Sequence, residues 1–164
     1  MGVGDVNSTE QGSGARFNDG KPKLEYVPLF TLLYTDSVRL LGEEKWNVLH
    51  MVSMVEARRM HHGCLMKYLT PQDIVEACTV MDYGANKYAA WNWAKGQPFS
   101  VAMASLKRHV LALGSGEETD EESGCSHWGH VVCNIIFLTH FLEFHPNMDD
   151  RPPAVCFGIT EETE

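Results

Sequence analysis

The chain has 164 residues, 44% of them hydrophobic and 21% charged, which is the balance of an ordinary globular protein with one domain. Its formal net charge of -9 opposes binding to a nucleic-acid polymer, although a free nucleotide can bind where divalent cations separate carboxylates from phosphates. The five Cys include no CxxC pair, which argues against a disulfide framework and for a reducing compartment.

The two ends differ in composition from the middle of the chain. Residues 1–15 are rich in Gly, Ser and polar residues and are expected to form a disordered arm. Residues 146–164 contain three Pro and end in acidic residues, so an irregular acidic tail is expected. A single domain is predicted over 16–145. Its longest apolar stretch, 131–142, is too short to span a bilayer, and no signal-peptide pattern precedes it, so a cytoplasmic location with no membrane contact is expected.

Helical spacing dominates the first half of this domain. Leu residues at helical intervals predict a helix over 24–41, entered through Pro28 in its first turn. A second pattern predicts a helix over 43–61. Thr70 and Pro71 then form a strong helix start, in which Thr caps and Pro occupies the first helical position.

The second half continues in the same way. After Gly96, Ser100 is expected to cap a helix that runs to Leu113 and ends at the following Gly-Ser-Gly. The last helix, over about 126–144, is apolar nearly all round and should therefore be central. Alternating strand patterns are absent from the sequence. We predict an all-α fold, a bundle of about five helices with the last helix at its core.

Polar residues interrupt the apolar last helix in a regular way. His127, His130 and Asn134 are three and then four residues apart, so they share one face. Buried polar groups without partners cost about 1–3 kcal/mol each. Each His can be an ordinary core residue bonded to a carbonyl or carboxylate, but three on one stripe after an acidic turn favour a site.

The acidic turn before that helix has two interpretations. A run of carboxylates between helices is usually a solvated loop, and acidic groups there also suit the helix dipole. Beside His109 and the histidines of the last helix, the same carboxylates could hold Mg²⁺ or Mn²⁺. The five carboxylates are Glu117, Glu118, Asp120, Glu121 and Glu122.

Residues 82–93 hold a second group of functional residue types. Lys87 could place its positive charge beside a phosphate, and Trp91 or Trp93 could stack on a base. Equally, the Trp residues could be core filler and Lys87 a surface charge. Arg108 also has two interpretations: it could form a surface ion pair with a carboxylate, or it could bind a phosphate through two hydrogen bonds.

Three segments together resemble a known family. They are ARFNDGKPKLEYVPL (15–29), YGANKYAAWNWAKGQP (83–98) and SLKRHVLALGSGEETDEESGCSHWGHVVCNIIFL (105–138). Their order is similar to that of a phage family of dATP/dGTP diphosphohydrolases, which resembles the all-α nucleotide pyrophosphatases of the MazG type. The chain departs from the family pattern in an insertion expected over 36–70. It also has Asp82 where Glu is common.

The resemblance implies hydrolysis of a purine deoxynucleoside triphosphate, dGTP or dATP, to the monophosphate and pyrophosphate. It implies Mg²⁺, or Mn²⁺ or Co²⁺, as cofactor and a homodimer or higher homo-oligomer. The residues assigned to metal binding are Asp82, Glu117, Asp120 and His130. Those assigned to catalysis are His109, Glu122 and His127. Those assigned to the substrate are Lys21, Lys87, Tyr88, Asn92, Trp93, Arg108 and Asn134.

Two alternatives belong to other classes of protein. The first is a nucleotide sponge, which would bind a host immune signalling nucleotide without turning it over and so act against host defence. The shortened carboxylate at Asp82 and the insertion would be tolerated in such a protein. The second is a structural helical module, which the convergence of so many polar groups disfavours.

Overall fold

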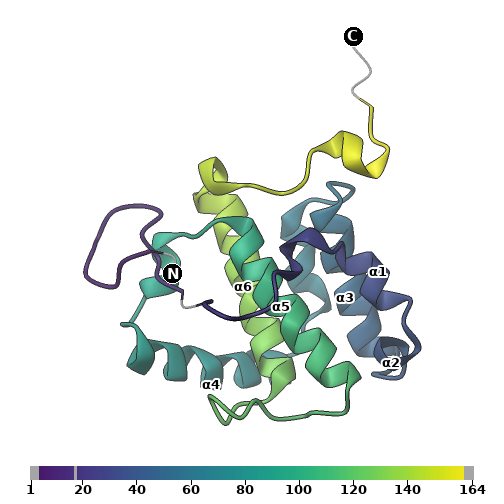
Figure 1. Cartoon of the computed structure of the whole chain (residues 1–164), viewed down its shortest axis with the longest axis horizontal. Helices are drawn as coiled ribbons and strands as arrows, with labels where there is room; N and C mark the ends of the chain where they lie inside the picture. Colours follow the sequence, from purple (N-terminus) through teal and green to yellow (C-terminus); the bar gives the residue numbers. More distant parts are fainter. Residues whose placement is uncertain (1–3, 17, 161–164) are drawn as a thin grey trace.

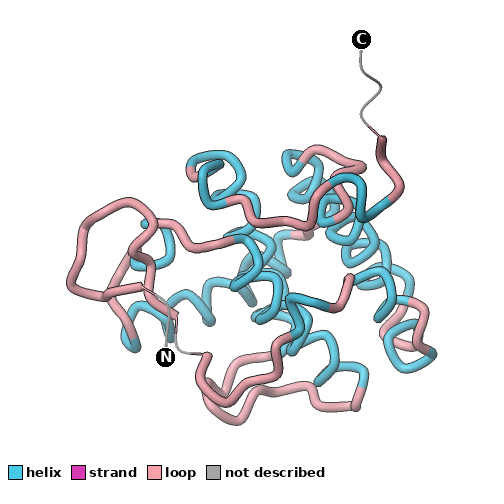
Figure 2. The backbone as a smooth tube through the Cα atoms, turned by 45° about the horizontal axis from the view of Figure 1, so that its top comes forward, coloured by secondary structure: helices cyan, strands magenta, loops and turns pink. Residues whose placement is uncertain are grey.

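The last helix is the central rod of the fold, as predicted. The computed structural model describes residues 4–16 and 18–160, which form six α-helices, five short 3₁₀ helices and one isolated bridge between Thr119 and Ser126. Helix α6 (His127–Phe144) runs through the middle, with α4 (Pro71–Lys87) and α5 (Phe99–Gly114) packed against it (Figure 1). Within the described residues no strand is present, so the prediction of an all-α fold is confirmed (Figure 2).

Helix α6 is held by its start and by its close approach to α4. The hydroxyl of Ser126 accepts a hydrogen bond from the Gly129 N–H, which caps the helix. A Cβ at Gly129 would lie 2.9 Å from the Glu76 carbonyl oxygen, so only Gly allows the two backbones to approach this closely. The predicted boundaries of this helix are confirmed within one residue.

Helix α4 begins where the sequence predicted. The Thr70 hydroxyl accepts from the Asp73 N–H, and the Asp73 carboxylate accepts from the Thr70 N–H. This reciprocal pair is a capping box with Pro71 in the first turn. The other Asp73 oxygen accepts from Trp128 Nε1 at 2.8 Å, so the cap also ties α4 to α6.

The helix predicted over 24–41 is instead divided into three pieces. They are η1 (Leu24–Tyr26), α1 (Leu29–Leu33) and α2 (Asp36–Arg39). The division between α1 and α2 falls at Thr35, whose backbone is extended and begins α2 as its N-cap. Leu spacing alone did not show this interruption.

Helix α3 (Glu43–Glu56) ends before the predicted residue 61, because Arg58 takes a left-handed conformation with φ 59°. The Arg58 guanidinium donates to the carbonyls of Arg151 and Pro152 in the tail, which holds the chain in this turn. The 3₁₀ helix η2 (His62–Tyr68) follows and packs on α3 and α6.

The start of α5 differs from the prediction in its cap. The helix begins at Phe99, and Ser100 lies inside its first turn. The carboxylate of Asp150 accepts from the Ser100 N–H at 2.7 Å and so supplies the missing cap from the tail. The tail itself contains only the short helices η4 (Pro146–Met148) and η5 (Ala154–Phe157) up to residue 160; residues 161–164 lie outside the described part.

The disorder expected for the N-terminal segment stays a prediction, but where the structure describes this segment it contacts the rest of the chain. The Gly14 N–H donates to the Gly96 carbonyl at 3.0 Å, and Ala15 is buried. The segment forms the purple loop beside η3 (Asn92–Lys95) in Figure 1. Residues 1–3 of the predicted arm lie outside the described residues.

One buried ion pair joins three helices outside α6. Lys107 Nζ of α5 lies 2.6 Å from Glu56 Oε2 of α3. The other Glu56 oxygen accepts from the Leu29 N–H at the start of α1. Within residues 4–16 and 18–160, no helix has the length and apolar character needed to cross a membrane.

Candidate functional site

A cavity of about 740 Å³ lies between α4, α5, α6 and the loops beside them. This volume is within the range of roughly 300–1,000 Å³ typical of small-molecule sites. Side chains from six separate segments line it. Those that matter for its chemistry are Arg16, Lys21, Asp82, Lys87, Tyr88, Asn92, Trp93, Ser105, Arg108, His109, Asp120, Glu122, His127, His130, Asn134 and Phe137.

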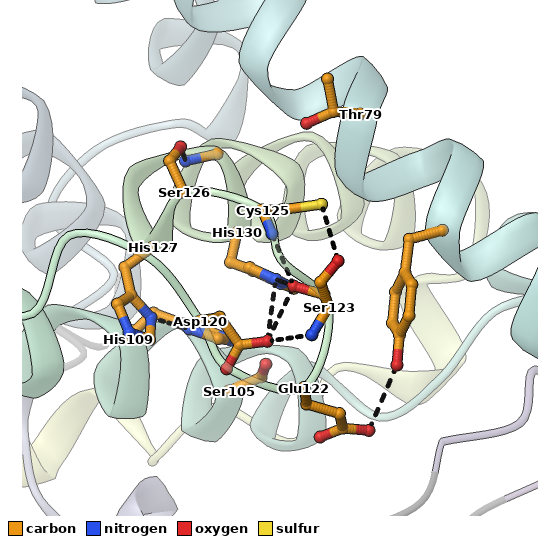
Figure 3. Close-up of polar contacts among 12 residues, drawn as sticks. Thr79, Ser105, His109, Asp120, Glu122, Ser123, Cys125, Ser126, His127 and His130 are labelled. Atoms are coloured by element: carbon orange, nitrogen blue, oxygen red, sulfur yellow. Dashed lines mark hydrogen bonds and ion pairs between the residues drawn. The ribbon is translucent and has the colours of Figure 1, made fainter.

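One end of the cavity holds three histidines and an aspartate. His109 comes from α5, and His127 and His130 from one face of α6, as their spacing predicted. The Nδ1 atoms of His109 and His127 are 2.8 Å apart, and the His109 ring stacks on that of His130 at 4.1 Å (Figure 3). Asp120 enters from the acidic turn.

Asp120 is oriented by its neighbours in that turn. It accepts hydrogen bonds from the Ser123 N–H at 2.9 Å and the Ser123 hydroxyl at 2.7 Å. The same hydroxyl lies 2.7 Å from His130 Nε2, so serine links the carboxylate to the imidazole (Figure 3). Burial opposes the ionisation of Asp120, but the two bonds from Ser123, together with His130 and His109, outweigh it and lower the pKa of the carboxyl.

Two of these histidines, His109 and His130, are neutral at neutral pH. Burial, with a smaller contribution from the neighbouring imidazoles, lowers the pKa of His109 to about 2. Burial also lowers the pKa of His130 to about 4, against the opposing attraction of Asp120. A neutral imidazole offers a lone pair, so these rings are suited to accept hydrogen bonds or to bind a metal.

Cationic side chains line the wall beside this cluster. Arg16 is partly buried and donates to Ser105 Oγ at 2.9 Å and Asn134 Oδ1 at 3.2 Å, both neutral groups. Arg108 donates to Asn18 Oδ1 at 3.3 Å. Burial lowers the pKa of both guanidinium groups, which remain charged at neutral pH. An anion in the cavity would therefore meet two arginines.

Two lysines complete the cationic wall and share one carboxylate. Glu122 contacts Lys87, and its second oxygen lies 3.7 Å from Lys21 Nζ. The Tyr83 hydroxyl also donates to it, at 3.4 Å. The bond from Lys87 lowers the pKa of Glu122 despite partial desolvation. Glu122 therefore lies between cations, as an anionic ligand would, whereas we had assigned it to catalysis.

The other end of the cavity is aromatic. Trp93 stacks on Phe137 with ring centroids 4.8 Å apart, and Tyr88 also lines the wall. Asn92 is buried, and its amide exchanges two hydrogen bonds with the backbone of Ala15. These bonds fix the N-terminal segment over the cavity, so the structure shows Asn92 in a positioning role.

The residues predicted to bind metal do not all come together. Glu117 is exposed and does not line the cavity; its carboxylate lies 3.8 Å from His127 Nε2. Asp82 lines the cavity but is exposed on α4. Among the described residues, the group with ligand atoms close enough for one ion is His109, Asp120 and His127, within 4.8 Å of one another. Of the predicted metal ligands, that group contains Asp120 but not His130, whose Nε2 lies 3.6 Å from the Asp120 carboxylate.

Sequence reasoning missed several residues of the site. Arg16 was noted only as part of the segment ARFNDGKPKLEYVPL (15–29), although that segment was the available signal for its role. Ser123, Ser105 and Phe137 carried no individual signal, because they act by contact with residues distant in the sequence.

Fold and cavity together define an all-α protein with a nucleotide-sized pocket that combines cations, imidazoles and aromatic rings. The family model "dATP/dGTP diphosphohydrolase, N-terminal" matches residues 56–151, more than half of the chain, so the chain belongs to this family. Residues 36–55 of the predicted insertion lie outside the match, and the insertion itself stays a prediction.

One relative is a protein of Salmonella phage PMBT28 named dATP/dGTP diphosphohydrolase. It is 30% identical over 98 residues, which are 59% of this chain and 33% of the relative. The match thus spans about a third of the relative's length. No solved structure matches the chain.

Proposed function

We propose that this chain hydrolyses a purine deoxynucleoside triphosphate, dGTP or dATP, to the monophosphate and pyrophosphate with a divalent metal ion. The observation that carries this proposal is the cavity that Arg16, Lys87 and Arg108 line together with the His–Asp cluster. The name of the phage relative supports the same activity. Because the chain has a net charge of -9, such a cationic wall is a local feature that suits a polyanionic ligand.

The two ends of the cavity fit the two ends of a nucleotide. The aromatic end, with Trp93 and Tyr88, offers ring surfaces for a purine base. The cationic wall would hold the triphosphate, and the Arg16 guanidinium can bind phosphate oxygens in its fixed fork geometry. This orientation puts the phosphates beside Asp120.

The reaction requires a water molecule whose oxygen forms a bond to the α-phosphorus. The bond from that phosphorus to the bridging oxygen breaks, and pyrophosphate leaves with the electron pair. The attacking water must also lose a proton. His109, with its pKa of about 2, is a poor proton acceptor, since a general base works best with a pKa near the operating pH. Asp120 and its neighbouring imidazoles would hold a divalent cation, which would lower the pKa of a bound water molecule.

The activity is tested by incubating the protein with dGTP and dATP and Mg²⁺, Mn²⁺ or Co²⁺, and resolving the products by chromatography. We expect equal amounts of dNMP and pyrophosphate from the wild type. Asp120→Asn should lose this activity, whereas Glu121→Gln, which removes an exposed carboxylate of the same turn, should keep it. Recovery of intact nucleotide from a tight complex after denaturation would instead establish the sponge.

The proposal extends to assembly and location. We propose a homodimer or higher homo-oligomer that acts on the nucleotide pool of the host cytoplasm. Light scattering of the purified protein measures the first. A monomeric mass at the concentration of the activity assay would contradict it.

A further inference from the structure

We propose that His109, Asp120 and His127 bind one first-row transition-metal ion, and that this site selects such an ion over Mg²⁺. Each residue offers one ligand atom, and the three atoms lie within 4.8 Å of one another. Bonds of about 2.1 Å to one ion place its ligand atoms roughly 3–4 Å apart, so small movements of the side chains suffice. The ion would replace the direct contact of the two imidazoles, whose Nδ1 atoms lie 2.8 Å apart.

The three residues are carried by well-fixed parts of the chain. His109 and His127 lie inside α5 and at the start of α6, two helices packed on each other. Asp120 lies in a turn closed by the bridge between Thr119 and Ser126 and by the His127 N–H bond to the Glu118 carbonyl. A metal site on such supports is largely preformed.

A second observation points independently to a ligand. His127 is 5% exposed and lines the cavity, yet its Nε2 atom has no hydrogen-bond partner among the described residues. The Glu117 carboxylate, at 3.8 Å, is beyond hydrogen-bond distance. A buried nitrogen without a partner is rare in folded proteins, because it loses its bonds to water without replacement. A metal ion bound at this nitrogen would supply the missing partner.

The residue types determine which ion fits. Two imidazoles and one carboxylate suit Zn²⁺, Co²⁺ or Mn²⁺, whereas Mg²⁺ prefers oxygen ligands throughout. Three protein ligands also leave a coordination position open, as in catalytic sites. Ser123, which bonds both Asp120 and His130, is the outer support that orients the carboxylate.

This inference deepens the proposed function and rests on it for its chemical purpose, but the site can be tested without a nucleotide. Chelator-treated protein would be titrated with Co²⁺, followed by visible absorption, and with Zn²⁺, followed by calorimetry. We expect one equivalent of either ion to bind. Asp120→Asn should weaken binding at least about 100-fold and Ser123→Ala at least about 10-fold, while Glu121→Gln should bind as the wild type does.

His127→Gln should also weaken binding by about 100-fold or more, with circular dichroism to show that the fold persists. If this buried substitution prevents folding, the partly buried Asp120→Asn and Ser123→Ala still decide the question. Unchanged affinity in Asp120→Asn would overturn the site. Displacement of Co²⁺ by a roughly hundredfold excess of Mg²⁺ would overturn its selectivity.

The failures of the two proposals give different results. Stoichiometric Co²⁺ binding that depends on Asp120, with no pyrophosphate released from any nucleotide, supports the metal site and contradicts the proposed hydrolase activity. Pyrophosphate release with Mg²⁺ by a protein whose Co²⁺ affinity is the same with or without the Asp120 carboxylate supports the hydrolase and removes this metal site.

Discussion

The protein buries charged and polar groups in two places, and it treats them differently. Between α3 and α5, Glu56 and Lys107 are both nearly inaccessible and neutralise each other at 2.6 Å. Glu56 also accepts a hydrogen bond from the Leu29 N–H, and Lys107 also donates one to the Leu24 carbonyl. In the cavity, by contrast, Arg16 and Arg108 lie on the same wall, and three imidazoles face one another.

This difference separates a structural cluster from one that needs a ligand. In the ion pair, each charge has its partner within the protein, so the arrangement is complete. In the cavity, burial lowers the pKa of Arg16 and of His109, which means that the charged forms are disfavoured there. A polyanion and a metal ion would supply the missing interactions. We therefore expect substitutions in the first cluster to affect stability and those in the second to affect binding and activity.

The largest effect is expected from opening the ion pair. Glu56→Gln leaves the Lys107 ammonium buried without its counter-charge, and breaking such a pair costs about 3–5 kcal/mol. Urea unfolding, followed by tryptophan fluorescence, measures this loss. The double variant Glu56→Gln with Lys107→Met should recover much of it, because no charge is then buried. A loss below about 1 kcal/mol in the single variant would mean that the pair is hydrated.

The converse substitution is Asp120→Asn in the cavity. We expect kcat for dGTP hydrolysis to fall at least about a hundredfold, or roughly 2.7 kcal/mol of transition-state free energy. The amide preserves the size of the side chain, so the free energy of unfolding should change by no more than about 1 kcal/mol. Steady-state kinetics and urea unfolding on the same preparation test both parts. A large loss of stability with normal kcat would reverse the assignment of the two clusters.

Acidification should act on the cavity cluster first. His109 and His130 have folded pKa values of about 2 and about 4, below the ordinary value of 6.5. Between each folded pKa and 6.5, the unfolded chain therefore binds more protons than the folded chain. Stability is therefore fully present above pH 6.5 and falls as pH decreases toward 4, by up to about 1.4 kcal/mol per pH unit for each histidine.

Urea unfolding of the chelator-treated protein from pH 7 to pH 5 measures this slope. His130→Gln, which keeps a polar side chain without the titrating ring, should reduce it. The same dependence in wild type and variant would show that other groups titrate in this range.

Local patterns in the sequence were sufficient to predict those features of the fold and the site that lie within a single helix. The shared face of His127, His130 and Asn134 follows from helical geometry alone, and the start of α4 follows from its capping residues. The interruption at Thr35 was missed because Leu spacing continues through it. The Arg58 turn depends on carbonyls more than 90 residues away, which no local pattern contains.

The acidic turn shows the same limit at the site. Five similar carboxylates lie within six positions, and the sequence could not say which of them turns inward. Gly116, with φ 87°, and the Thr119–Ser126 bridge determine the path of the turn. As a result Asp120 enters the cavity, while Glu117 stays 63% exposed at its side chain. Which carboxylate serves the site is therefore a property of the folded turn.

The smallest effect, and the one that refines the comparison most, is expected at Glu122. This carboxylate joins Lys21 and Lys87 but is half exposed, so its ion pairs contribute about 0–1 kcal/mol. Because it occupies the position expected for phosphate, Glu122→Gln should free both lysines and lower KM for dGTP by about two- to fivefold, with little change in kcat. Glu121→Gln serves as the matched control. A fall of kcat by about a hundredfold or more would instead restore the catalytic role assigned from sequence, because loss of a catalytic proton acceptor has that magnitude.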